Sequence, residues 1–314
     1  MKERNQIQFK YIFSHLLLLP VLLLLSLIIQ GECFLFLTIV QTFLLILFFA
    51  GYWEFQGVRF RWSYCSAMEI MNIALILANQ LSSTTEPYNQ SRLIFFVLLE
   101  LYLLFTLFKI ILVIFKNDQE NVEIRFPFKH GAYLITDGGN SKTSRLMNYH
   151  FHSPLHKKKK TNLAMLYATD IVKLSEIPTK FLPFRNEDYP IFDEEIVAPI
   201  EGVILKVIND IEDNQPFSGN YKYNTGNTVV IKKDNFYFLL GHLKKGSIEV
   251  KEGDFVHQND LIGKAGNSGM SERPHLHMQL MKCESDDYWK GRGVCIRVEG
   301  KNLYKNRLIT VLQL

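Results

Sequence analysis

Cysteine, proline and glycine are scarce in this sequence, which holds 4, 10 and 18 of them in 314 residues. So few cysteines exclude a disulfide-stapled scaffold, and so little glycine and proline exclude a collagen-like repeat. Excess charge is also lacking, because 35 Lys or Arg against 31 Asp or Glu leave a net charge of only +4. Such a small charge, spread along the chain, indicates no dedicated nucleic-acid surface, so we expect no nucleic-acid partner.

Apolar residues, in contrast, make up 48% of the chain, which rules out intrinsic disorder. Their distribution is uneven, because residues 1–115 contain only seven Lys or Arg and six Asp or Glu. A helix needs about 20 mostly apolar residues to cross a bilayer. The segments of this region that meet or approach that requirement are 11–30, 33–53, 62–81 and 93–115.

These segments predict a membrane region of three or four helices over residues 1–115. Glu69 and three amide side chains interrupt segment 62–81, so its crossing is left open. The positive-inside rule places the basic residues before segment 11–30 in the cytoplasm, with Arg59 and Arg61 on that side after two crossings. We expect a multi-pass protein of the bacterial cell membrane. Three crossings would put the rest of the chain outside the cytoplasm, which we favour, and four would return it inside.

Glu69 and Glu100 are acidic groups within the predicted helices. A carboxylate inside a membrane can serve a transport or proton step. We interpret both instead as polar groups that are satisfied between packed helices or near an interface. The membrane region is therefore predicted to act as an anchor in the lipid bilayer.

After a linker at 116–129, the sequence predicts a β-rich domain over residues 130–314. Short apolar alternations end at Gly, Asn, Asp and Pro, which is typical of antiparallel sheets. No helical period persists. The expected fold class is thus a multi-pass α-helical membrane region followed by a mainly antiparallel β domain. The candidate strands are 196–209, 228–233, 236–243, 255–265 and 275–281.

Histidine carries the chemical information in this domain. His150 and His152 form a pair in NYHFH, and His275 and His277 form another in PHLHMQL. Residues two apart on a strand face the same side, so both rings of a pair can address one site. One such pair would be weak support for a site, but two in one domain indicate a shared chemistry.

Two more polar residues accompany the pairs: His242 ends the apolar run FLLGHL, and Asp170 lies in YATDIV. Imidazole nitrogen and carboxylate oxygen are typical ligands of Zn²⁺. A catalytic zinc site keeps one position open for water, which the metal activates while it polarises a carbonyl. The pattern therefore predicts a zinc site with a base beside it.

The domain resembles the lysostaphin-like, or LytM-domain, zinc metallopeptidases. The stretches that carry the resemblance are APIEGVI and GNTVVIKKDNFYFLLGHLKKGSIEVKEGDFVHQNDLIGKAGNSGMSERPHLHMQL. Upstream, NYHFH and YATDIV fit a branch whose first ligand lies on an earlier segment. The resemblance covers roughly residues 130–300 and implies a largely antiparallel sheet with an open groove walled by loops.

The resemblance also implies a role for each candidate residue. Asp170 and His277 would bind zinc, and His242 and His275 would be the catalytic histidines. Zinc-activated water would attack the scissile carbonyl, with the two histidines assisting proton transfer, and no acyl-enzyme would form. The implied substrate is a peptide bond in peptidoglycan stems or cross-bridges.

The first zinc ligand departs from the commoner family spacing. That spacing puts a histidine four residues before the aspartate, where this chain has Leu166, which cannot ligate. We expect the ligand to come from NYHFH, where the Asn-x-His pattern favours His150 over His152. Asn140 or Asn148 could occupy the open metal position in a latent state, and whether an activating partner exists is left open.

Three other interpretations compete with the cell-wall enzyme. A cytoplasmic domain would be a zinc peptidase that processes a cytoplasmic or exported peptide. The second alternative is a non-catalytic LytM-like scaffold, but such scaffolds typically lack the ligands that are present here. The third is a carrier domain, because VKEGDFVHQNDLIG resembles a lipoyl-domain hairpin, but the hairpin offers no convincing lysine at its tip for attachment.

The state of two cysteines is left open. Cys283 and Cys295 could pair outside the cytoplasm, and free thiols are equally consistent.

Overall fold

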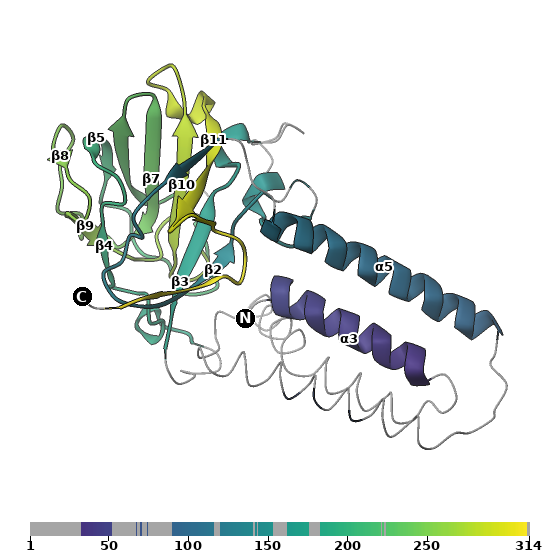
Figure 1. The fold of residues 1–314 in the computed structure, drawn as a ribbon. Coiled ribbons are helices and arrows are strands. Elements are labelled where there is room, and N and C mark those ends of the chain that lie inside the picture. The colour runs from purple at the N-terminus through teal and green to yellow at the C-terminus, as the bar shows by residue number, and fades with distance from the viewer. Residues whose placement is uncertain are drawn as a thin grey trace. The chain divides into compact units, whose positions relative to one another are not determined.

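The computed structural model describes residues 33–51, 67, 70, 74, 90–115, 120–140, 142, 144–152, 162–175, 183–220, 222 and 224–312. The chain divides into two compact units. The first comprises Met1–Trp53 and Val58–Leu112, and the second comprises Glu54–Gly57 and Val113–Leu314. Each unit is described by itself below, with the element labels of Figure 1.

The first unit contains the apolar helix α3 (Cys33–Ala50) and all but the last three residues of the apolar helix α5 (Gln90–Phe115). The Thr42 hydroxyl of α3 donates a hydrogen bond of 2.7 Å to Oε1 of Glu100 in α5. This contact agrees with the interpretation of Glu100 as a group satisfied between helices. The second oxygen, Oε2, has no hydrogen-bond partner among the described residues.

Within the described residues, one helix is long and apolar enough to cross a membrane, Ile94–Phe115. It coincides with the predicted segment 93–115. Residues 33–50 of the predicted segment 33–53 form the helix α3. Segment 11–30 and nearly all of segment 62–81 lie outside the described residues. The described chain therefore supports one candidate span and not the three or four of the predicted multi-pass region.

The second unit is built on an 11-stranded sheet with the main strand order β13-β2-β3-β10-β7-β6-β5-β8, and β4 and β9 form a separate pair. Every paired set of strands is antiparallel except β1 with β11. The predicted antiparallel β domain is confirmed. The strands are β1 (Asn121–Glu123), β2 (Gly131–Asp137), β3 (Thr169–Leu174), β4 (Glu195–Val197), β5 (Gly202–Ile208), β6 (Asn227–Lys233), β7 (Phe236–Leu243), β8 (Phe255–Val256), β9 (Leu261–Lys264), β10 (Leu276–Lys282), β11 (Arg292–Val298), β12 (Lys301–Asn302) and β13 (Leu308–Val311).

Two of the predicted strands are each divided in the structure. Segment 196–209 becomes β4 and β5, separated at Pro199, which has no N–H for a strand ladder. Segment 255–265 becomes β8 and β9, separated by a turn in which Asn259 has a φ of +75°. β1 lies within the stretch predicted as a linker and pairs with β11.

The two faces of the sheet differ, and this difference places the candidate site. Leu276, Met278 and Leu280 of β10 point into the main core together with Phe238 and Leu240 of β7. Alternate residues of a strand point to opposite faces. The side chains between them on β10, among them His277, therefore lie on the other face of the sheet, where a smaller core of six buried residues packs. The strands that carry the site, β3 and β10, lie side by side in the sheet (Figure 1).

Candidate metal centre

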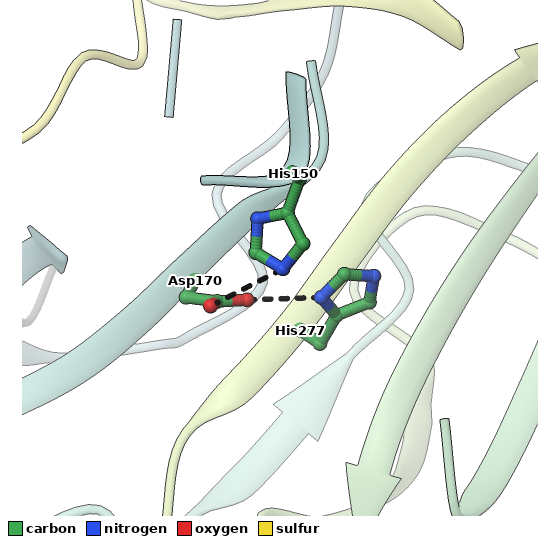
Figure 2. A group of neighbouring side chains, drawn as sticks. All are labelled: His150, Asp170 and His277. Atoms are coloured by element: carbon green, nitrogen blue, oxygen red, sulfur yellow. Dashed lines mark hydrogen bonds and ion pairs between the residues drawn. The ribbon is translucent and has the colours of Figure 1, made fainter. Parts of the chain in front are cut away.

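The register of two neighbouring strands brings Asp170 and His277 together. In the antiparallel pair β3–β10, these residues stand directly opposite each other. Nδ1 of His277 lies 2.9 Å from Oδ1 of Asp170 (Figure 2). The His277 side chain is 2% exposed and that of Asp170 is 14% exposed, so the pair is held away from bulk water.

A third donor comes from outside the sheet. His150 begins a short 3₁₀ turn, His150–His152, and is buried. Its Nε2 lies 3.5 Å from Oδ2 of Asp170, and its ring centroid is 4.9 Å from that of His277. Figure 2 shows the His150 and His277 rings pointing at the same carboxylate from two elements. The other His150 nitrogen, Nδ1, has no hydrogen-bond partner among the described residues.

These three residues fit a metal ion by the chemistry of their donors. One ligand atom from each of His150, Asp170 and His277 lies within 4.8 Å of the others. Nε2 of His277 lies 3.0 Å from the amide oxygen of Gln279, which can only accept a hydrogen bond. Nε2 therefore carries a proton, and Nδ1, which faces Asp170, is the nitrogen that would bind a metal once its own proton is displaced. Two imidazoles and one carboxylate, with an outer amide that orients one ring, are a donor set suited to Zn²⁺.

Burial and the neighbouring charged groups shift the pKa values of this cluster in opposite directions. Burial alone would raise the pKa of Asp170, but the imidazoles of His150, His275 and His277 hold it well below its ordinary value. Burial would likewise lower the pKa of His277, yet the hydrogen bond and charge of Asp170 raise it. For His150, burial outweighs the attraction of Asp170 and lowers the pKa. A cation held here would replace the proton that Asp170 favours on His277.

Two further histidines, His242 and His275, stand beside the three donors. Their ring centroids are 4.7 Å apart, and Nε2 of His275 lies 3.6 Å from Oδ1 of Asp170. Nδ1 of His242 lies 2.7 Å from the Ser268 carbonyl, and Nδ1 of His275 lies 2.8 Å from the Arg273 carbonyl. Because carbonyls only accept, both Nδ1 atoms carry the proton, and each Nε2 is free to accept one.

The backbone of β7 directs His242 to the site. Leu240 and Leu243 both lie in the main core, so the alternation of the strand is broken between them. His242 has a φ of +60°, a left-handed conformation that bulky residues seldom adopt. Its N–H donates to the Thr225 carbonyl at 2.7 Å, which fixes the irregular turn. Backbone strain of this kind is concentrated at functional sites.

Both histidines are held neutral by their surroundings. Burial lowers the pKa of His242 well below its ordinary value, and the neighbouring imidazoles of His275 and His277 lower it further. Burial also lowers the pKa of His275, against the attraction of Asp170. A neutral imidazole with an unprotonated Nε2 is suited to accept a proton at neutral pH.

The structure also places the other residues that the sequence analysis singled out. Cys283 and Cys295 are both buried and do not form a disulfide with each other. The Asn140 amide lies 3.5 Å from the Tyr167 hydroxyl, whereas Asn148 is bonded to backbone groups on three sides. His152 ends the 3₁₀ turn, and its side chain is outside the described part of the chain.

Sequence reasoning missed Gln279, and it named Asn148 only as a possible occupant of the open metal position and not as a supporting residue. Gln279 is fully buried and stands two residues after His277, the spacing that puts both on one strand face. Asn148 is the first residue of the Asn-x-His pattern. In the sequence, both are amide residues two positions away from a candidate ligand, and this spacing could have indicated their roles.

Part of the candidate site lies in a stretch of the chain that matches a known protein family. The family model described as "Peptidase family M23" matches residues 189–292, which contain His242, His275 and His277. This part of the chain is a peptidase M23 (LytM-like) domain. His150 and Asp170 precede the matched stretch, so their roles rest on the arrangement in Figure 2.

Curated relatives of the M23 domain include an uncharacterized metalloprotease of Buchnera aphidicola subsp. Baizongia pistaciae, 35% identical over 104 residues, or 33% of this chain and 26% of the relative. Endolysin 2638A of Staphylococcus phage 2638A is 44% identical over 61 residues, or 18% and 13%. The peptidoglycan DD-endopeptidase ShyA of Vibrio cholerae is 28% identical over 110 residues, or 35% and 23%. The chain thus spans about a quarter or less of the length of these relatives.

Similar solved structures include the catalytic domain of lysostaphin from Staphylococcus simulans, at 18% identity and a TM-score of 0.28, covering 52% of this chain and 88% of that one. A zinc-containing peptidase from Vibrio cholerae has 19% identity and a TM-score of 0.33, covering 55% and 39%. Superpositions at these scores add nothing to the sequence match.

Proposed function

We propose that this chain is a membrane-anchored zinc metalloendopeptidase that cleaves peptide bonds in peptidoglycan stems or cross-bridges. The observation that carries the proposal is the buried cluster of His150, Asp170 and His277, with His242 and His275 beside it. The names of two relatives, an endolysin and a peptidoglycan DD-endopeptidase, support the substrate class.

Each residue of the site has a distinct task in this proposal. His150, Asp170 and His277 would hold the metal. Bound zinc would supply Lewis acidity, which activates water and polarises the scissile carbonyl. Nε2 of His242 and of His275 would accept protons, because each Nδ1 is already fixed on a backbone carbonyl. Once protonated, Nε2 would donate to the developing oxyanion or return its proton to the leaving amine. The Ser268 and Arg273 carbonyls would keep both rings in the required tautomer.

A digestion experiment tests the reaction. The full chain, purified in detergent, is incubated with peptidoglycan sacculi, and the soluble products are analysed by mass spectrometry for new peptide amino termini. We expect cleaved peptides that disappear when a chelator is added and return when zinc is restored, because the site needs a cation to activate water. Intact stems and cross-bridges in the presence of stoichiometric zinc would contradict the proposed substrate.

We propose that α5 anchors the protein in the membrane, because the surface of this helix is apolar. Large apolar side chains of this helix are exposed, among them Ile94, Leu98, Tyr102 and Phe115, at 61%, 62%, 66% and 77%. Exposure of such an apolar surface to water is unfavourable, whereas its contact with lipid chains is not.

The side of the membrane on which the M23 domain lies decides its substrate. We expect a reporter fused after Leu314, active only outside the cytoplasm, to be active in intact cells, since mature peptidoglycan lies there. A reporter active only inside would contradict the cell-wall assignment. The same zinc site would then act on a cytoplasmic or exported peptide.

A further inference from the structure

We infer that Asn148 is a positioning residue that sets the separation between two candidate ligands, His150 and Asp170. The inference rests on the proposed metal site. These ligands are 20 positions apart in the sequence and come from different elements, a 3₁₀ turn and strand β3. Something other than regular secondary structure must therefore hold them at the 3.5 Å that separates His150 Nε2 from Asp170 Oδ2.

Asn148 bonds to three backbone segments at once. It is fully buried, at 0% exposure. Its Oδ1 accepts the N–H of His150 at 3.0 Å, and its Nδ2 donates to the carbonyls of Gly139 and Ala168 at 3.1 Å each. The amide thereby joins the turn that carries His150 to the chain two residues before Asp170.

A second contact fixes the same turn from β2. Oδ1 of Asp137 accepts the N–H of Tyr149 at 3.0 Å. In the β2–β3 pair, Asp137 stands opposite Asp170. The residue between Asn148 and His150 is therefore tied to the strand beside Asp170, and the turn cannot shift along β3 without breaking both contacts.

Only an amide satisfies all three bonds of Asn148. The side chain must offer an acceptor to one N–H and two donors to two carbonyls, which is the hydrogen-bonding capacity of asparagine. Aspartate has the same shape but places an oxygen against two carbonyl oxygens. Alanine leaves three buried backbone groups without a partner, which is costly.

Zinc affinity of the full chain in detergent tests this role. The variants are Asn148→Asp and Asn148→Ala, and their zinc dissociation constants are measured by competition with a chromophoric chelator. We expect zinc affinity to fall about 10–100-fold in each, the range for partners that orient ligands. Cobalt substituted for zinc should also show a changed visible spectrum, which reports the ligand geometry.

Asn227→Asp is the matched control. Asn227 is also 0% exposed and bonds to three backbone groups, on Ile211 and Leu243, but none belongs to a segment that carries a candidate ligand. We expect it to lose thermal stability as the Asn148 variants do while it keeps wild-type zinc affinity.

The possible outcomes separate the two proposals. Wild-type affinity in a folded Asn148→Asp or Asn148→Ala protein would overturn this inference alone. Equal losses of zinc affinity in Asn148→Asp and Asn227→Asp would also overturn it, because a general loss of stability would then explain both. A wild-type chain that binds no zinc would instead contradict the proposed function.

Discussion

We expect the replacement of Asp170 with alanine to remove zinc from the protein and to abolish peptide cleavage. Asp170 is the only anionic donor of the cluster, and the imidazoles of His150, His275 and His277 lie around it. Without the carboxylate, a divalent cation would have only neutral donors in a buried site. We expect a loss of zinc affinity beyond the roughly 10–100-fold typical of outer partners. Elemental analysis of the purified variant and the digestion assay measure the two effects.

A surface carboxylate provides the control for this prediction. Asp286 forms an ion pair of 2.8 Å with Lys232, and its side chain is 83% exposed. Such exposed pairs contribute little to stability. Asp286→Ala should therefore keep both zinc and activity. Stoichiometric, tightly bound zinc in the Asp170→Ala protein would show that the metal lies elsewhere.

Replacing His275 with alanine should also abolish turnover, but this variant should retain zinc. His275 lies outside the three-donor cluster, and its Nδ1 is fixed on the Arg273 carbonyl. Its loss removes a proton acceptor beside the reacting carbonyl. Positioned acids and bases contribute about 10²–10⁴-fold to rates, so we expect kcat/KM to fall by that factor. Metal content and kinetics measured on the same preparation distinguish a catalytic residue from a ligand.

His257 offers a comparison within the same domain. It is exposed and packs against Phe255, with ring centroids 5.1 Å apart. His257→Ala should cleave at the wild-type rate. Full activity in His275→Ala would refute the role given to that residue, and a loss of zinc would make it a ligand instead.

Periodicity predicted much of the sheet because its strands alternate between two faces. The segments 228–233 and 236–243 became β6 and β7 with nearly the expected bounds. The boundary errors arose at Pro199 and Asn259, where single residues end a ladder. β2, β3, β11 and β13 were not among the predicted strands. Partners of β2, β3 and β13 lie far away in the sequence, whereas β11 pairs with its sequence neighbours β10 and β12 and was missed for no such reason.

The candidate site was predictable in its residue types but not in its geometry. His-x-His pairs and an isolated aspartate indicated zinc chemistry. The opposition of Asp170 and His277 depends on β3 lying beside β10, a contact between residues 107 positions apart. The placement of His150 depends on Asn148 and Asp137, whose partners are backbone groups. Sequence patterns carry no direct information on such contacts.

The order in which the ribosome makes the three donors has a consequence for when the proposed metal site can form. His150 and Asp170 precede His277, and β3 has no β10 to pair with until that strand exists. At about 5–20 residues per second, the 107 positions from Asp170 to His277 take roughly 5 to 20 s to translate. Throughout that time the nascent chain has at most two of its three donors, so the unfinished peptidase cannot attack the proteins around it.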